Sequence, residues 1–372
     1  MIEQLPIVWQ DKLKALSFET LTPIQEAIFE PIKNGKNILA ISPTGTGKTL
    51  AYLLPTLLNV KPQKGQQLLI LAPNTELSGQ LFDVAKNWAE PLGLTAQLFI
   101  SGTSQKRQIE RLKKGPEILI GTPGRIFELI KHKKIKMMAI DTIVLDEFDD
   151  LLSDSQYHFV NRITHHVPKT HQMIYVSATN SVDKNVLEKD TDIIDLSQNV
   201  LNTITHYYLF LEKRERLEVL RKLANIPEFR GLVFFNKLSD LGASEEKLQF
   251  NHVRAISLAS DVNTRFRRVI LEKFKSNEIS LLLGTDLLAR GLDIDDLAYV
   301  INYDLPSSKE SYIHRSGRTG RMGKSGIVIT LITHKEELKQ LKKWADVSEV
   351  ILKNQKLQLI QANPKNKKSV SP

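Results

Sequence analysis

One eight-residue stretch near the start of the chain combines the residue types that bind nucleotide phosphates. It runs from Ser42 to Thr49 and reads Ser-Pro-Thr-Gly-Thr-Gly-Lys-Thr. Gly45 and Gly47 let the backbone wrap an anion without Cβ atoms in the way. Backbone N–H groups then face the phosphate, Lys48 reaches its outer oxygens, and the Thr49 hydroxyl can bind Mg²⁺. The predicted phosphate-binding residues are Ser42, Thr44, Gly45, Thr46, Gly47, Lys48 and Thr49.

A second stretch, residues 143–149, ends an apolar run in carboxylates and reads Ile-Val-Leu-Asp-Glu-Phe-Asp. A phosphate-binding loop (P-loop) needs such a pair opposite it for hydrolysis. Asp146 can hold the Mg²⁺ shell, and Glu147 can orient and deprotonate the attacking water. The two stretches together predict a nucleotide hydrolase whose catalytic residues include Glu147 and Lys48.

Both stretches lie where a short apolar run ends, and such runs alternate with amphipathic ones along most of the chain. Expected strands in the first half are Asn37–Ile41, Gln67–Ala72, Ala96–Ile100, Glu117–Gly121, Thr142–Asp146 and Met173–Ser177. Those in the second half are Tyr207–Leu211, Gly231–Phe235, Ala255–Leu258, Ser280–Gly284, Ala298–Asn302 and Gly326–Ile332. Helix-like segments such as Thr75–Ala89 and Gly124–Lys131 follow the strands. This alternation predicts α/β units, each a mostly parallel sheet with helices on both faces.

The length of 372 residues suggests two domains. A polar stretch interrupts the alternation near residue 200. We predict a first domain at 1–198, a linker at 199–205, a second domain at 206–355, and a basic, disordered tail at 356–372.

Composition narrows the class of protein. Fifty-one Lys and Arg against 42 Asp and Glu give a net charge of +9, which favours an anionic partner. The chain has no cysteine, so disulfide and thiol chemistry are excluded. The N-terminus lacks the pattern of a signal peptide, and no apolar run approaches the ~18 residues of a membrane span. We expect a cytoplasmic protein.

Further motifs appear in the order found in one family. Phe18 with Leu-Thr-Pro-Ile-Gln at 21–25 resembles an adenine-reading Q motif, 284–294 resembles motif V, and 312–321 resembles motif VI. The chain thus resembles DEAD-box RNA helicases of superfamily 2, in its minimal, core-only bacterial form, over residues 18–321. The resemblance implies two tandem RecA-like domains and an RNA-stimulated ATPase that uses ATP and Mg²⁺.

The resemblance also implies roles for residues at matching positions. The residues expected to contact adenine and ribose are Phe18, Thr22, Gln25 and Asp293. The metal ligands would be Thr49 and Asp146, acting through water, and the arginine fingers Arg318 and Arg321. RNA contacts fall to Pro73, Asn74, Gly102, Thr122, Pro123, Gly124, Arg125, Thr285, Arg290 and Gly291. Residues that couple hydrolysis to RNA would be Asp149, Ser177, Thr179 and His314.

Two departures from the family pattern affect these expectations. Motif II reads Asp-Glu-Phe-Asp, with Phe148 in place of the family's alanine, and we expect room for this ring under the Ser-Ala-Thr triplet at 177–179. Both chemical carboxylates are present, so we expect hydrolysis to survive and coupling to unwinding to be the property affected. In motif Ia, Asn74 and Thr75 replace a threonine and an arginine.

Two basic clusters flank these motifs. They comprise Lys106, Arg107, Arg111, Lys113 and Lys114, then Lys131, Lys133, Lys134 and Lys136. They can add nonspecific attraction to nucleic acid. We interpret most of these lysines as solvated helix surface.

The leading functional prediction is an RNA-stimulated ATPase that locally separates short duplexes or remodels RNA–protein complexes. The carboxylates lie in one domain and the arginine fingers in the other, so closure of the two domains is a condition for catalysis. Two alternatives stay open: an ATP-gated RNA clamp or assembly scaffold with little unwinding, and a superfamily 2 DNA helicase. Pre-ribosomal particles are candidate partners because relatives of this type act in ribosome assembly, and we expect a monomer.

Overall fold

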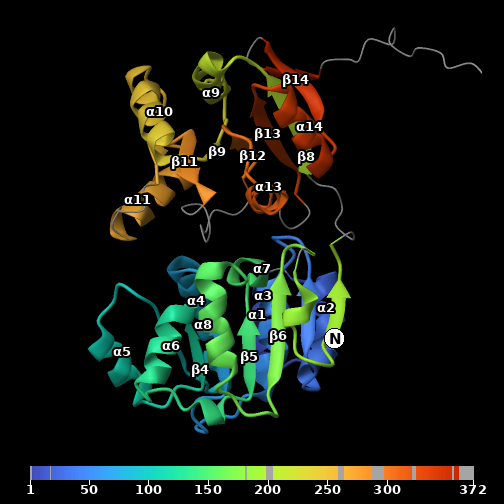
Figure 1. The fold of residues 1–372 in the computed structure, drawn as a ribbon, viewed down its shortest axis with the longest axis vertical. Coiled ribbons are helices and arrows are strands. Elements are labelled where there is room, and N and C mark those ends of the chain that lie inside the picture. The colour runs from blue at the N-terminus through green and yellow to red at the C-terminus, as the bar shows by residue number, and fades with distance from the viewer. Residues whose placement is uncertain are drawn as a thin grey trace, which may run out of the picture. The chain divides into compact units, whose positions relative to one another are not determined.

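A computed structural model describes residues 2–16, 18–180, 182–197, 204–258, 264–286, 297–320, 324–353 and 356–359. These residues form two compact units, one built from the described residues up to 197 and the other from those starting at 204. Figure 1 shows the elements of each unit. Every helix in the described part of the chain is too short or too polar to span a lipid bilayer.

The first unit is built on a parallel sheet. Its strands are β1 (Ile38–Ile41), β2 (Leu68–Leu71), β3 (Ala96–Phe99), β4 (Ile118–Gly121), β5 (Thr142–Leu145), β6 (Gln172–Ser177) and β7 (Asp192–Asp195). Their order across the sheet is β3-β4-β2-β5-β6-β1-β7, and all neighbouring strands run parallel. Strand β7 was not predicted, because Asp-Ile-Ile-Asp lacks the apolar run that marked the other strands.

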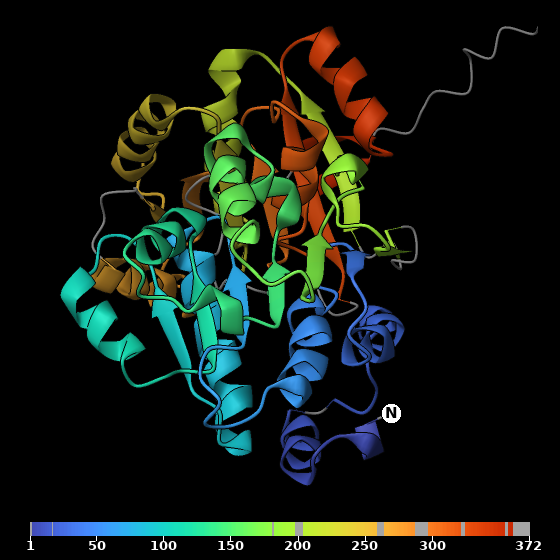
Figure 2. The same ribbon diagram turned by 60° about the horizontal axis from the view of Figure 1, so that its bottom comes forward.

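Apolar side chains on both faces explain why these segments form central parallel strands. Along β1, Ile38 and Ala40 join one core, whereas Leu39 and Ile41 join the other. The helices that supply the first core are α1 (Ile7–Ala15), α2 (Pro23–Lys33), α3 (Lys48–Asn59) and α4 (Thr75–Ala89). The second core is covered by α5 (Gln105–Leu112), α6 (Pro123–Lys131), α7 (Phe148–Leu151) and α8 (Asp154–Thr164). Figure 1 and Figure 2 show these helices on both faces of the sheet.

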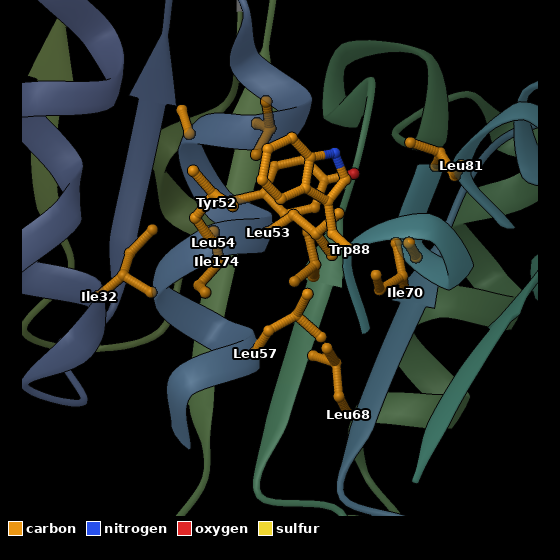
Figure 3. Close-up of a cluster of buried hydrophobic side chains, with 14 of the residues drawn as sticks. Ile32, Tyr52, Leu53, Leu54, Leu57, Leu68, Ile70, Leu81, Trp88 and Ile174 are labelled. Carbon is orange, nitrogen blue, oxygen red and sulfur yellow. The ribbon is translucent and has the colours of Figure 1, made fainter. Parts of the chain in front are cut away.

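The first core positions the helix that begins at the P-loop. Figure 3 shows Leu57 of α3 close to Leu68 of β2, and Tyr52 of α3 in the part of the same core that holds Trp88 of α4. Burying a large apolar side chain stabilises the fold by about 1.5–3 kcal/mol. Helix α3 is therefore held firmly against the sheet. Short 3₁₀ helices connect other elements: η1 (Ile2–Gln4), η2 (Glu90–Leu92), η3 (Met137–Ala139), η4 (Lys184–Val186) and η5 (Lys213–Glu215).

The second unit repeats the architecture with a different edge. Its strands are β8 (Ile204–Phe210), β9 (Gly231–Phe235), β10 (Ala255–Ser257), β11 (Leu281–Thr285), β12 (Tyr299–Asn302), β13 (Gly326–Ile332), β14 (Ser348–Lys353) and β15 (Lys356–Leu359). Their order is β10-β11-β9-β12-β13-β8-β14-β15, and only β14 and β15 pair antiparallel among these described strands. The helices are α9 (Arg216–Ala224), α10 (Leu238–Phe250), α11 (Thr264–Lys275), α13 (Lys309–Ser316) and α14 (Lys335–Trp344). Both units thus have the predicted α/β class, a mostly parallel sheet between helices.

Two expectations about segment limits need correction. Residues 204 and 205, assigned to the linker, begin β8 and pair with Gly326 and Ile327 of β13. The predicted disordered tail starts at 356, yet residues 356–359 form β15 against β14. Composition misses this strand because Lys-Leu-Gln-Leu is short and half polar. The rest of the predicted tail lies outside the described residues.

Candidate nucleotide and RNA site

The predicted nucleotide residues gather at one edge of the first sheet. The P-loop follows β1, Asp146 follows β5, and Ser177 ends β6. These three strands are neighbours in the order β5-β6-β1. Because parallel strands share a carboxyl edge, the topology brings the phosphate loop and both carboxylates together. Ligands of open α/β sheets bind at this edge.

The predicted RNA residues of the first unit continue along the same edge. Pro73 and Asn74 follow β2, Gly102 follows β3, and the 122–125 segment follows β4. Those strands are also neighbours, in the order β3-β4-β2. The predicted residues therefore divide the carboxyl edge into a nucleotide half and an RNA half, which meet between β2 and β5.

The P-loop is closed on itself by hydrogen bonds. Nζ of Lys48 donates to the carbonyl oxygens of Ser42 (2.6 Å) and Pro43 (2.9 Å). The Thr46 hydroxyl donates to the Pro43 carbonyl at 2.8 Å and lies 2.8 Å from the Ser42 hydroxyl. Gly47 has a φ of 85°, a left-handed conformation in which a side chain is strained. The loop has the curvature and the glycines of a phosphate cradle.

Gly45 and the two threonines of the predicted site complete this loop. Gly45 has a φ of 80°, and Thr44 and Thr49 are partly exposed. Helix α3 begins at Lys48, so Thr49 lies in its first turn. The helix N-terminus thus presents free N–H groups where an anion would sit.

Gln25 connects the Q motif to the P-loop. Its Oε1 accepts from the backbone N–H of Thr22 at 2.9 Å, and its Nε2 donates to the Gly47 carbonyl at 3.2 Å. A Cβ on Gly47 would lie 2.6 Å from Gln25 Nε2, so a side chain at this position would displace the Gln25 amide from the P-loop. Phe18 is partly buried against the first core. The predicted adenine contacts of Phe18, Thr22 and Gln25 stay predictions.

Asp146 is buried and held by two donors. Its Oδ2 accepts from the Tyr52 hydroxyl at 3.0 Å, and its Oδ1 accepts from the Glu147 N–H at 2.9 Å. Burial raises the pKa of Asp146 to about 6, and the nearby Glu147 charge adds to the rise, while Lys48 opposes it. Tyr52 is buried too, and its pKa is raised well above the usual range, by burial first and then by Asp146.

Glu147 stands in a strained turn with an unmet acceptor. Its φ of 48° and ψ of 55° are left-handed, a conformation that costs a non-glycine residue of order 1–3 kcal/mol. Its Oε2 is buried and has no hydrogen-bond partner among the described residues. Such a group in a native protein points to a catalytic role or an ion. Together with Thr49 and Asp146 it offers the hard oxygen ligands that suit Mg²⁺.

Phe148 packs against β6, the strand that leads to the triplet under which it was expected. The ring is 1% exposed and packs on Tyr175, with ring centroids 4.8 Å apart. It lines a cavity of about 200 Å³ between β6 and α8, together with Tyr157, Val160 and Met173. The larger side chain is accommodated in the second core, because Phe148 starts α7 pointing into that core.

The connection from motif II to the Ser-Ala-Thr triplet is intact. The Thr179 hydroxyl donates to Oδ2 of Asp149 at 3.0 Å. Ser177 and Thr179 bind each other, with the Ser177 hydroxyl donating to the Thr179 carbonyl at 2.8 Å. The phenylalanine in motif II therefore leaves the contact between Asp149 and Thr179 in place.

Several predicted RNA residues also hold the fold. Asn74 caps α4, its Oδ1 accepting from the N–H groups of Glu76 and Leu77. Thr122 is the residue before α6, with Pro123 and Gly124 in the first turn. Arg125 is 6% exposed, and it donates to Gln108 at 3.1 Å and to Glu128 at 2.6 Å. RNA contacts of these residues stay predictions, and Nη2 of Arg125 is buried with no partner among the described residues.

In the second unit, Arg315 of α13 makes an extensive set of hydrogen bonds. In the sequence, this residue stood out only as part of motif VI. Its guanidinium donates to Asp286 (2.5 Å), Asn236 (2.7 Å) and the Asp304 carbonyl (3.0 Å). These partners follow β11, β9 and β12, so one arginine ties three strand ends together. It also lies over the Phe234 ring, 5.1 Å from its centroid.

Three other predicted residues of the second unit lie within the described part of the chain. His314 and Arg318 are buried, and Thr285 is the last residue of β11. Four predicted positions lie outside the described residues: Arg290, Gly291, Asp293 and Arg321.

Sequence reasoning missed Tyr52 and Arg315. Tyr52 is four residues after Lys48, so the helical repeat places both on one face of α3, toward the strand that ends in Asp146. For Arg315, the available signal was the pair of carboxylates at strand ends, Asp286 and Asp304.

Comparison with known proteins decides the family. The model of the DEAD/DEAH box helicase family matches residues 22–187, and that of the helicase conserved C-terminal domain matches residues 212–323. The probable ATP-dependent RNA helicase YfmL of Bacillus subtilis is 42% identical over 343 residues, which cover 90% of this chain and 91% of YfmL. The chain belongs to the DEAD-box RNA helicase family. As a member, it is an RNA-stimulated ATPase.

Further similarities cover nearly all of this DEAD-box protein. The DEAD-box ATP-dependent RNA helicase CshC of Bacillus cereus is 35% identical over 380 residues, which cover 100% of this chain and 98% of CshC. A structure of S. cerevisiae Dbp5 bound to RNA and ADP BeF3 is similar with a TM-score of 0.82 at 26% identity, covering 93% of this chain and 94% of Dbp5. Both units therefore have the RecA-like fold.

Proposed function

We propose that this DEAD-box protein hydrolyses ATP when RNA brings its two units together, and that closure locally separates short duplexes. The observation that carries the proposal is the divided carboxyl edge of the first sheet. One rigid sheet presents the nucleotide loop on β1 and the predicted RNA loops on β2, β3 and β4. A shift of this sheet therefore reaches both ligands at once.

We propose the following roles within the first unit. Lys48 leaves its two carbonyl partners and binds the outer phosphates of ATP. Thr49 and Asp146 hold Mg²⁺ through its water shell, and the ion supplies charge to the phosphates. Glu147 orients the attacking water and accepts its proton, for which its unmet Oε2 is suited. Phe18, Thr22 and Gln25 select adenine.

The second unit would complete the site. We propose Arg318 and Arg321 as arginine fingers, since planar guanidinium groups suit the charge of a transferring phosphoryl. Asp293 would bind the ribose, and His314 would couple the ligands. If ATP and RNA each favour the closed state, each raises the affinity for the other. Loss of the γ-phosphate then reopens the clamp.

A specific observation favours unwinding over the clamp alternative. The bond between Asp149 and Thr179, which would carry the coupling, is present despite Phe148. A duplex-release assay tests this directly, with ATPase activity measured in parallel on the same RNA. We expect release by the unmodified protein and none by Glu147→Gln. ATP hydrolysis without release by the unmodified protein would contradict the proposal and support a clamp.

The finer parts of the function need their own tests. ATPase stimulation by RNA and by DNA of equal length separates an RNA helicase from a DNA helicase. Crosslinking of Glu147→Gln to cellular RNA tests the proposed pre-ribosomal partners, and light scattering tests the proposed monomer. The end of the first domain at residue 198 and the cytoplasmic location are also proposals. Limited proteolysis and cell fractionation would check them.

A further inference from the structure

A pocket opens at the opposite edge of the first sheet, away from the nucleotide and RNA halves. Its volume is about 350 Å³. It is formed by three loops that precede strands: 65–66 before β2, 113–115 before β4, and 133–136, on the way to β5. Strands β2, β4 and β5 each have four residues, so about 13 Å of strand separates the two edges at ~3.3 Å per residue. The pocket is therefore distinct from the site described above.

Four lysines line this pocket, and all four are exposed: Lys113, Lys133, Lys134 and Lys136. Within the described part of the chain, none of them forms an ion pair. Four more exposed lysines belong to the same loops or flank them: Lys61, Lys64, Lys114 and Lys131. Carboxylates at this edge are fewer: Glu117 accepts from the N–H groups of Gln63 and Thr95, and the exposed Asp141 directly precedes β5. The excess of lysine charge is self-repelling, so an anion bound among the lysines is stabilised.

The pocket has a built wall behind the exposed lysine side chains. Leu112 and Gln66 are buried, and Ile109 lies beside them in the lining. Oε1 of Gln66 accepts from the backbone N–H of Lys136 at 2.7 Å, which fixes the 133–136 loop to the start of β2. The charges thus surround a fixed hollow with an apolar floor, and they are not scattered along a flat helix face.

We propose that this lysine pocket binds the phosphate backbone of RNA outside the helicase site and so tethers the flank of the RNA being remodelled. The inference rests on the proposed function, because the tethered RNA is the same molecule that stimulates the ATPase. RNA is favoured over an acidic protein as the ligand because this chain is an RNA-stimulated ATPase. A flank held near the protein has a high effective concentration. Lysines are point charges without the fork that reads bases, so the site is sequence-independent.

The test compares two quadruple variants. One changes the pocket lysines to glutamine: Lys113→Gln, Lys133→Gln, Lys134→Gln and Lys136→Gln. The matched control removes the same charge from exposed lysines of the same unit outside the pocket: Lys14→Gln, Lys169→Gln, Lys184→Gln and Lys189→Gln. Two RNAs are used, the shortest oligouridylate that fully stimulates the ATPase of the unmodified protein, and the same strand extended by a duplex flank.

We expect the pocket variant to bind the extended RNA at least tenfold more weakly than the control variant at low salt. Each lost phosphate contact lowers the slope of log affinity against log salt by about 0.7–0.9, so four contacts lower it by roughly 3. Half-saturation of the ATPase by the short RNA should be the same for both variants. Unchanged circular dichroism and unfolding midpoints show that both variants are folded.

Three results would overturn the proposal. Equal salt slopes for the two variants would show that the lysines are solvated surface. An equal loss with the short RNA would place them in the helicase site itself. Displacement of the flank by polyglutamate as readily as by competitor RNA would assign the pocket to an acidic protein. Failure of the proposed function looks different, since the unmodified protein would then show no ATPase stimulation by the short RNA.

Discussion

The motif II turn of the first unit and helix α13 of the second unit both place charged residues at the carboxyl edge of a parallel sheet. They treat these charges in opposite ways. In the motif II turn, Glu147 is strained and has a buried oxygen without a partner among the described residues. In α13, all five N–H donors of Arg315 have acceptors. The first arrangement leaves a hydrogen-bond acceptor available to a ligand. The second uses its donors to hold three strands together.

This difference separates two kinds of motif residue: those with polar atoms free of protein partners, and those whose polar atoms are all bonded within the protein. An unmet buried acceptor destabilises the fold, so its presence indicates a function. Removing a fully bonded buried guanidinium destabilises the fold, because its acceptors are left without a donor. We therefore expect substitutions in the motif II turn to change turnover and substitutions around α13 to change stability.

The largest effect is expected for Glu147→Gln. The amide cannot accept the proton of the attacking water, so turnover should fall by about 10²–10⁴-fold. The unfolding midpoint should stay unchanged, because Oε2 has no partner to lose among the described residues. Steady-state ATPase assays with saturating RNA and thermal unfolding measure the two quantities. Glu110→Gln, on the exposed surface of α5, is the matched control. Turnover within threefold of the unmodified protein would rule out Glu147 as the base.

Arg315→Ala should produce the largest loss of stability. It leaves Asp286 and Asn236 without their buried cation, at a cost of about 3 kcal/mol, the low end for a buried pair because the Asp286 side chain is 33% exposed. Hydrogen exchange followed by mass spectrometry should show lost protection in β9, β11 and α13, with β1 and β5 unchanged. Arg315→Lys keeps the charge without the fork, so an intermediate loss is expected. Full protection in Arg315→Ala would mean that α13 is held by its other contacts.

A pH-dependent loss of stability is expected from the second anchor of α13. Nδ1 of His206 lies 2.8 Å from the Tyr312 hydroxyl, and burial lowers the pKa of His206 to about 4, with Asp346 opposing the shift. The unfolded chain takes up this proton near pH 6.5, before the folded chain does. Stability is therefore present above pH 6.5 and is lost as pH falls toward 4, by about 2 kcal/mol between pH 7 and pH 5.

Urea unfolding at pH 7 and pH 5 measures the stability that His206 contributes at each pH. The control is His206→Gln, which does not titrate and keeps a polar group near Tyr312. The unmodified protein should lose more stability than the variant between the two pH values. Equal losses would show that the pKa of His206 is the same in the folded and the unfolded chain.

Much of the fold follows from the sequence for a simple reason. Central parallel strands must be apolar on both faces, so runs such as Leu68–Leu71 and Gly231–Phe235 are visible without any structure. An edge strand need not be apolar on both faces, although the edge strands β3 and β10 were predicted from their apolar residues. That is why β7 and β15, with their polar residues, were not predicted.

The site was predictable in composition but not in contacts. Phosphate chemistry demands the glycines, Lys48 and the carboxylates, and the topology brings them to one edge. Which way a side chain points depends on packing far away in the sequence. Phe148 enters the second core because Tyr175 and α8 leave room there, and Arg125 is drawn inward by Gln108 and Glu128. No local pattern encodes such choices.

The smallest effect is expected for Tyr52→Phe, which tests whether the motif II turn depends on support from the first core. The Tyr52 hydroxyl donates to Oδ2 of Asp146, 94 residues away, from a ring that is fully buried. Removing it deletes one hydrogen bond to a buried carboxylate, which contributes about 1.5–3 kcal/mol when the acceptor is charged. Asp146 keeps the Glu147 N–H, so the carboxylate remains in place but is less firmly oriented.

Affinity for a fluorescent ADP should therefore fall by about threefold to tenfold in the presence of Mg²⁺ and stay unchanged in EDTA, since the proposed role of Asp146 is in the metal shell. Leu57→Met, a volume-conserving change in the same helix, controls for altered packing of α3. An equal loss of affinity with and without Mg²⁺ would mean that Tyr52 supports the P-loop as a whole and has no particular bearing on Asp146. The support would then be general to the first core, and the contrast between the two charged regions would rest on Glu147 alone.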